Sequence, residues 1–161
     1  MKKWIALGFA VIAAMVLLLL PNEPKKQYYH HQGNIFGTYY NIRYEGTEDW
    51  HAAIQQRLQD FDHSLSMFNP NSVISHVNRN DSVLTDSLFE AMYHEAHAIS
   101  RLSNGAFDIT VAPRVNAWGF GNNSQQILSP NIDSIKTFVG YEKIRLIDHR
   151  IIKDDERITL D

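Results

Sequence analysis

The alternation of hydrophobic and polar positions predicts a β-hairpin in the first part of the chain. Residues 28–31 and 35–44 each read as a strand, and the Gly33-Asn34 pair between them favours a tight turn. In the second strand, large apolar side chains at positions 40, 42 and 44 alternate with polar ones, which is typical of a strand with one buried face.

A different spacing, with apolar residues every three or four positions, predicts a helix after this hairpin. Thr47 is expected to be its N-cap, followed by two acidic residues in the first turn. Asn69-Pro70 is expected to end it. The predicted buried face consists of Trp50, Ile54, Leu58, Phe61 and Leu65.

The same spacing predicts a second long helix. Ser87 and Glu90 form a capping-box pattern at its start, and Asn104-Gly105 suits its end. Its predicted buried stripe consists of Leu88, Met92, Ala96 and Ile99. Between the two long helices, Ser72 is expected to cap a short one.

The last third of the chain predicts a short helix and then strands. Ser129-Pro130 would open the helix and Gly140 would close it. Strands are expected at residues 143–147, 150–153 and 157–160, with a turn at Asp154-Asp155 between the last two. The fold class is therefore α+β, with helices packed on a largely antiparallel sheet. Because the alternation of the last strand continues to the final residue, we expect the fold to be truncated at its carboxyl end.

The first twenty residues have the pattern of a signal peptide or signal anchor. Lys2 and Lys3 precede an unbroken apolar run at residues 4–20, which would be about 25 Å long as a helix. No small-x-small cleavage site follows the run, which favours an uncleaved anchor with the domain outside the cytoplasm. The predicted organisation is this segment at residues 1–20, a linker at 21–27 and a domain at 28–161.

The composition and charge of the chain exclude several kinds of binding site and reaction. The formal net charge is −3 and there is no long basic block, so non-specific binding of nucleic acid has no electrostatic support. The chain has no cysteine, which excludes disulfides, thiolate metal sites, cysteine nucleophiles and a lipid-modified cysteine. His94 and His97 are three positions apart rather than the four of the zinc-protease pattern, so a solvated helix face explains them better.

Three segments carry candidate binding chemistry. Residues 103–121, S-N-G-A-F-D-I-T-V-A-P-R-V-N-A-W-G-F-G, combine glycines, an acid and aromatic rings; a glycine-capped helix end followed by a buried loop is the alternative. Residues 65–78 either present Phe68 to a flat ligand or simply connect two helices. Phe36-Gly37-Thr38, expected inside the second strand, marks either a close approach of a ligand or a bulge.

In this order and spacing, the three segments resemble the amino-terminal half of the ApbE family of FAD:protein FMN transferases. Phe36-Gly37-Thr38 stands where the family has Met-Gly-Thr. Residues 65–78 fit the pattern L-S-x-aromatic-x-P-x-S-x-(I/L)-S-x-(V/L)-N. Residues 103–110 with 118–120 fit (T/S)-x-G-A-F-D-x-T followed by W-G-F.

This resemblance implies an enzyme that binds FAD and Mg²⁺ and transfers FMN to a threonine hydroxyl of an acceptor flavoprotein. The acceptor would belong to membrane electron transport, and the anchored domain would face the periplasm from the inner membrane. The residues expected to touch FAD are Phe36, Phe68, Ala106, Phe107 and Asp108. The family's catalytic groups and metal ligands would lie beyond residue 161, so this chain would supply the FAD-binding half and no metal ligand.

Two alternatives stay open at this point. The chain could be a membrane-anchored flavin-binding module without catalytic activity. It could also be an anchored structural domain in which the three segments serve only packing.

Overall fold

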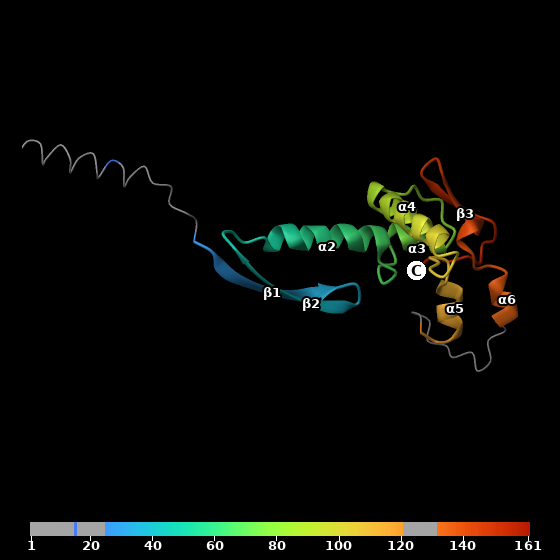
Figure 1. Ribbon diagram of the computed structural model, residues 1–161, viewed down its shortest axis with the longest axis horizontal. Helices are drawn as coiled ribbons and strands as arrows, with labels where there is room; N and C mark the ends of the chain where they lie inside the picture. The colour runs from blue at the N-terminus through green and yellow to red at the C-terminus, as the bar shows by residue number, and fades with distance from the viewer. Residues whose placement is uncertain (1–14, 16–24, 121–131) are drawn as a thin grey trace, which may run out of the picture. The chain divides into compact units, whose positions relative to one another are not determined.

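Strands β1 (Gln27–Ile35) and β2 (Thr38–Gly46) pair into the predicted hairpin, but its turn lies elsewhere (Figure 1). The turn is Phe36-Gly37, with φ angles of 53° and 69°, as a two-residue hairpin turn requires. Gly33 instead lies within β1 against the ring of Tyr40, where an added Cβ would be 2.6 Å from Tyr40 Oη. The prediction of a Gly33-Asn34 turn was wrong because the cross-strand ring, and not a turn, requires the glycine.

The structure is a computed structural model that describes Met15, residues 25–120 and residues 132–161. Apart from Met15, the predicted signal segment lies outside the described residues, and so does Ser129-Pro130. No helix in the described ranges is both long and apolar enough to cross a membrane. The chain divides into two units, one of residues 1–31 and 42–49 and the other of residues 32–41 and 50–161.

In the first unit, the base of the hairpin is held by aromatic and polar contacts. The rings of Tyr29 and Tyr44 stack with centroids 5.2 Å apart. Asp49 accepts a hydrogen bond from Tyr44 Oη and lies 2.9 Å from His31 Nε2. The Asp49 carboxylate therefore bonds to residues of the hairpin, and Asp49 does not lie in the first turn of a helix. The helix predicted to start after Thr47 accordingly begins later.

Helix α2 (His51–Leu65) follows, with Trp50 at the N-cap position and no side-chain cap hydrogen bond. Four of the five predicted core positions are half-buried, whereas Trp50 is exposed. The buried residue of this helix is Ser64, whose hydroxyl donates to Asp86 Oδ1 at 2.9 Å. Helix α3 (Val73–Asn78) confirms the predicted cap, because Ser72 Oγ accepts from the backbone N–H of Ser75.

Helix α4 (Ser87–Leu102) is capped by Asp86 and not by the predicted Ser87. Asp86 Oδ1 accepts from the N–H of Phe89. The residues that the helix buries are Phe89, Tyr93 and Ser100. This face is offset from the predicted stripe, in which Met92 and Ile99 are 45% and 40% exposed. The predicted end is confirmed, since Asn104 and Gly105 take positive φ and the Gly105 N–H bonds to the carbonyl of Ser100.

Three short helical segments follow: α5 (Ala112–Ala117), α6 (Ile132–Lys136) and the 3₁₀ turn η1 (Tyr141–Lys143). Helix α5 lies within the candidate segment at residues 103–121. Strands β3 (Ile144–Ile147) and β4 (Arg150–Lys153) then pair antiparallel, as predicted. The fold is α+β as expected, and its described strands form two separate two-stranded sheets.

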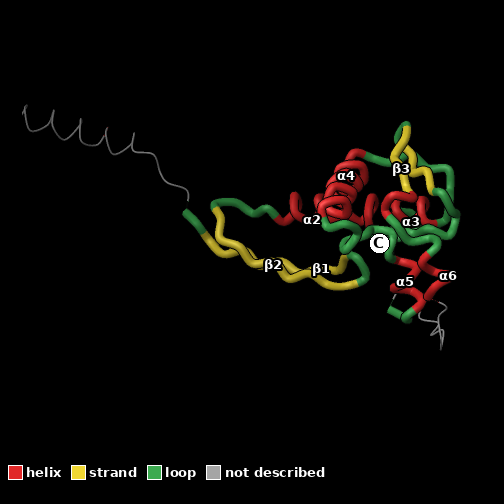
Figure 2. The backbone as a smooth tube through the Cα atoms, turned by 45° about the vertical axis from the view of Figure 1, so that its right-hand side comes forward, coloured by secondary structure: helices red, strands yellow, loops and turns green. Residues whose placement is uncertain are grey.

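The prediction of a strand at residues 157–160 is wrong, because these residues form no strand in the described structure. Ile158 and Leu160 are 0% and 2% exposed, so the alternation correctly indicated their burial. The Asn78 side chain takes the place of a neighbouring strand, because it accepts from the Leu160 N–H and donates to the Leu160 carbonyl. This places the carboxyl end among α3, α4 and α5 in both ribbon views (Figures 1 and 2). The core around it contains Ile74, Val77, Phe89, Tyr93, Ile144, Ile158 and Leu160.

Candidate functional site

Phe68 stands on a loop, residues 66–72, whose backbone is fixed by buried hydroxyl groups. Ser72 Oγ donates to the Ser66 carbonyl at 2.7 Å, and Ser75 Oγ donates to the Asn69 carbonyl at 2.8 Å. Ser66 and Ser72 are 5% and 0% exposed, whereas Phe68 is 60% exposed. The loop therefore presents an exposed apolar ring on a rigid backbone, which is the arrangement expected of a ligand wall.

The hairpin turn meets this loop. An added Cβ at Gly37 would lie 2.8 Å from Cδ1 of Phe68, so the turn backbone contacts the ring directly. Phe36, the other turn residue, is half-buried. The structure thus brings the Phe36-Gly37 turn and Phe68 together, and the glycine is required for this close approach as well as for its φ angle.

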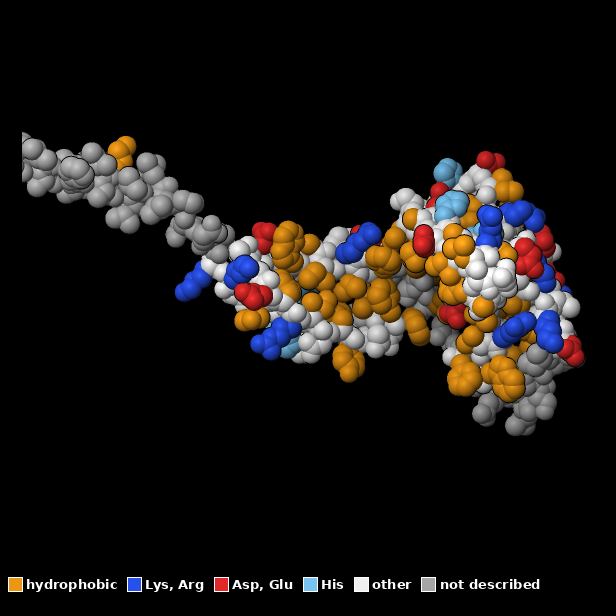
Figure 3. Space-filling model, viewed as in Figure 1, with side chains coloured by type: hydrophobic (Ala, Val, Ile, Leu, Met, Phe, Trp, Pro, Cys, Tyr) orange, Lys and Arg blue, Asp and Glu red, His pale blue; other side chains and the backbone are white. Residues whose placement is uncertain are grey.

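A groove of about 500 Å³ runs from Phe68 to the carboxyl end of the chain. Its lining mixes apolar and polar side chains, among them Phe68, Arg79, Asn116, Phe120, Thr159 and Asp161. Hydrophobic side chains are also exposed on the face shown in Figure 3. The exposed apolar residues of the described chain include Met92, Ile99 and Leu102 of α4.

The second candidate loop is held by one carboxylate. Asp108 Oδ1 accepts from both the N–H and the hydroxyl of Thr110, at 2.8 Å and 2.7 Å, and Oδ2 accepts from the Tyr141 N–H at 3.0 Å. Thr110 is fully buried, and its hydroxyl oxygen also accepts from the Gly140 N–H. Both oxygens of Asp108 therefore have partners, and the carboxylate ties residues 105–110 to the segment before β3.

Ala106, Phe107 and Asp108 line a second groove, of about 460 Å³, together with Arg114 and Asp161. Phe107 is 45% exposed at its edge. Asp161 lines this groove as well as the one beside Phe68. The predicted flavin-contacting residues thus form two groups, Phe36 with Phe68 and residues 106–108, and the grooves of both groups end at Asp161.

Several lining residues were not among the predicted site residues. Arg79 stands one position beyond the motif at residues 65–78, and its position in the sequence gives no sign that it lines the groove. Asp161 reaches both grooves only because its N–H bonds to the carbonyl of Ile109, a contact between distant parts of the chain. Arg114, on α5, carries an Nε that is buried and has no hydrogen-bond partner in the described structure.

The charges near the first groove are paired. The imidazole of His76 hydrogen-bonds Asp81 and, with a further contribution from Arg79, holds the pKa of that carboxyl below its usual range. Within the described ranges, no three His, Asp or Glu side chains cluster closely enough to hold a metal ion. The His, Asp and Glu side chains of the described ranges therefore form no metal-binding site among themselves.

Comparison with known proteins identifies the class. The profile of the ApbE family matches residues 36–161, and the chain belongs to this family. Among its relatives, the FAD:protein FMN transferase of Haemophilus influenzae is 31% identical over 160 residues, which covers 91% of this chain and 46% of the relative. The one of Vibrio cholerae is 27% identical and covers 100% of this chain and 50% of the relative.

Solved structures show the same fold. The flavin transferase ApbE from Vibrio cholerae superposes with a TM-score of 0.75 at 24% identity, covering 85% of this chain and 48% of that one. The apo form of the flavinyl transferase ApbE from Pseudomonas stutzeri gives a TM-score of 0.71 at 21% identity. The chain spans about half the length of the curated relatives it matches.

Proposed function

We propose that this chain supplies FAD-binding surfaces to an enzyme that transfers FMN from FAD to a threonine hydroxyl of an acceptor flavoprotein. The observation that carries this proposal is the convergence at Asp161 of two grooves, each edged by an exposed phenylalanine ring. FAD has two flat ring systems joined by a pyrophosphate, so two apolar walls with a polar junction suit it. The relatives named FAD:protein FMN transferase support the same assignment.

Within this proposal, the two loops have different tasks. Phe68 offers a ring face on a loop whose backbone is already ordered, so little backbone freedom is lost on binding. In the second loop, Ala106 and Phe107 form the wall, and Asp108 holds the loop in shape through Thr110 and Tyr141.

The chemical step needs groups beyond these walls. Transfer forms a bond between the threonine oxygen and the phosphorus of the FMN moiety and releases AMP, which requires charge neutralisation and a base for the hydroxyl proton. Mg²⁺ would supply the former, as the family resemblance implies. Because the described residues form no metal cage, we derive no step through Mg²⁺ from them.

We also propose an anchored location. The apolar run at residues 4–20 behind Lys2 and Lys3 supports attachment to the inner membrane with the domain facing the periplasm. Such a location would place the chain beside membrane-bound acceptor flavoproteins.

Flavin binding is tested by adding the full chain, in detergent, to FAD and following the flavin fluorescence. Phe68→Ala is expected to weaken binding by about tenfold, which corresponds to roughly 1.4 kcal/mol of lost ring contact. Leu102→Ala, which shortens a side chain that is 86% exposed at the end of α4, is the control and should leave binding unchanged. An unchanged FAD signal at high protein concentration would remove flavin binding from the proposal.

Transfer is tested separately, by mass spectrometry of a threonine-containing acceptor incubated with FAD, Mg²⁺ and the chain. Covalent FMN on the acceptor supports the full proposal. Binding without transfer favours a flavin-binding module, and transfer that appears only after a relative's carboxyl-terminal half is added would show that this chain is the binding part.

A further inference from the structure

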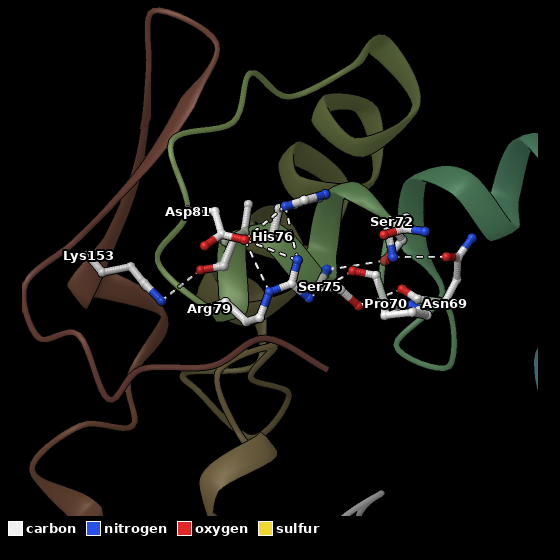
Figure 4. A network of polar contacts seen from close by, with 10 residues as sticks. Asn69, Pro70, Ser72, Ser75, His76, Arg79, Asp81 and Lys153 are labelled. Carbon is white, nitrogen blue, oxygen red and sulfur yellow. Dashed lines mark hydrogen bonds and ion pairs between the residues drawn. The ribbon is translucent and has the colours of Figure 1, made fainter.

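Arg79 connects the end of α3 to the loop that carries Phe68. Its Nη1 donates to the carbonyl of Pro70 at 2.8 Å, across nine positions of sequence (Figure 4). Its Nε donates to Asp81 Oδ2 at 3.1 Å. The guanidinium thus bridges two backbone segments with a fork whose directions are fixed by its planar geometry.

The backbone carbonyls around Phe68 are held by three different side chains. Ser72 holds the carbonyl of Ser66 and Ser75 holds that of Asn69, while the carbonyl of Pro70 is held by Arg79. Because the ring of Phe68 is 60% exposed, burial does little to fix its position, and the backbone on either side of it must do so. Arg79 therefore adds a second anchor on the carboxyl-terminal side of Phe68, next to that of Ser75.

His76 contacts both Arg79 and Asp81. Its Nδ1 lies 3.0 Å from Arg79 Nη2 and 2.9 Å from Asp81 Oδ2 (Figure 4). A neutral ring with its proton on Nε2 can accept from Arg79, whereas a ring protonated at Nδ1 donates to Asp81. Arg79 Nη2 also lies 3.0 Å from Asp81 Oδ2, so Asp81 holds the guanidinium with either form of the ring.

We propose that Arg79 is a positioning residue for Phe68, acting through the carbonyl of Pro70. The ligand in this inference is the flavin of the proposed function, on which it rests. The further charged groups at this end of α3 are Lys153, which donates to the Val77 carbonyl, and Glu156, whose carbonyl accepts from Asn80.

The first experiment does not depend on flavin. Hydrogen exchange of residues 66–72, followed by mass spectrometry of the full chain in detergent, should be faster in Arg79→Gln than in the wild type. Arg101→Gln, an exposed arginine in the last turn of α4, is the matched control and should not change it. Unchanged exchange in Arg79→Gln would overturn the positioning role, whether or not the chain binds flavin.

The second experiment measures binding of riboflavin and of FAD. If Arg79 acts through Phe68, Arg79→Gln weakens both ligands by about the same factor, roughly threefold to tenfold. The same substitution should have almost no further effect in a Phe68→Ala background, since coupled residues are not additive. A loss confined to FAD would show that Arg79 contacts phosphate directly and would overturn the inference.

If exchange responds as expected and the wild type binds no flavin, the proposed function fails while the positioning role of Arg79 stands.

Discussion

The two loops that carry the candidate flavin contacts are held in opposite ways. The Phe68 loop is fixed by several weak anchors that are spread along it: two serine hydroxyls and one guanidinium, each on a different carbonyl. In the loop at residues 105–110, by contrast, three side-chain hydrogen bonds converge on one carboxylate, Asp108.

The two loops are therefore expected to respond differently when one anchoring side chain is removed. Because the spread anchors hold different carbonyls, losing one loosens its own part of the loop and leaves the other anchors in place. A single carboxylate that joins a buried threonine to a distant N–H has no substitute, because its loss leaves buried donors without acceptors. The Asp108 loop should therefore be the more sensitive of the two to a single substitution.

Asp108→Ala tests this comparison with the largest expected effect. Removal of the carboxylate leaves the hydroxyl and N–H of Thr110 without their acceptor, and Thr110 is fully buried. We expect the free energy of unfolding to fall by about 3 kcal/mol, the upper range for hydrogen bonds to a charged group. Urea denaturation measures it. Asp133→Ala, on an exposed carboxylate of α6, should change stability by less than about 0.5 kcal/mol. Equal losses in the two variants would mean that Asp108 is no special anchor.

Much of the local structure could be predicted because its determinants are neighbours in sequence. Ser72 caps the short helix through the N–H of Ser75, and Asn104-Gly105 ends α4 with positive φ angles. Both need only residues within a turn of one another, and so does the β3–β4 hairpin. Residues 65–78 connect two helices, as one of the two alternatives for them predicts, and Phe68 is exposed, as the other requires.

What could not be predicted depends on contacts between distant residues. Gly33 looks like a turn residue, but the ring of Tyr40 requires it within a strand. In the strand-like segment at residues 157–160, the N–H of Leu160 donates to the side chain of Asn78, 82 positions away, and not to a neighbouring strand. The meeting of both grooves at Asp161 depends on the same long-range contacts, so the sequence indicated the candidate walls but not their common end.

Ser72→Ala tests the comparison in the loop that carries Phe68. It removes the cap of α3 and the bond to the Ser66 carbonyl, so we expect a loss of about 1–2 kcal/mol in the free energy of unfolding. Ser87→Ala is the control, because Ser87 has the sequence signature of a cap but Asp86 occupies that position in α4. A loss from Ser72→Ala as large as that from Asp108→Ala would contradict the view that the first loop shares its anchors.

The smallest effect is expected at Glu90, a carboxylate with side-chain partners but at the surface. Its Oε1 accepts from Thr85 Oγ1 and lies 2.7 Å from His149 Nδ1, and the hydrogen bond from Thr85, followed by that from His149, lowers the pKa of Glu90. A carboxyl group whose pKa is lower in the folded chain contributes stability above its unfolded pKa of about 4.3, and loses it as the pH falls through the folded value. Glu90→Gln should therefore flatten the decline of stability below about pH 4.5, measured by urea denaturation across the acid range. At neutral pH the variant should be only slightly less stable, because a glutamine amide oxygen can still accept from Thr85 and water competes for the contact with the exposed His149. A neutral-pH loss comparable to that of Asp108→Ala would contradict this ranking of the two carboxylates.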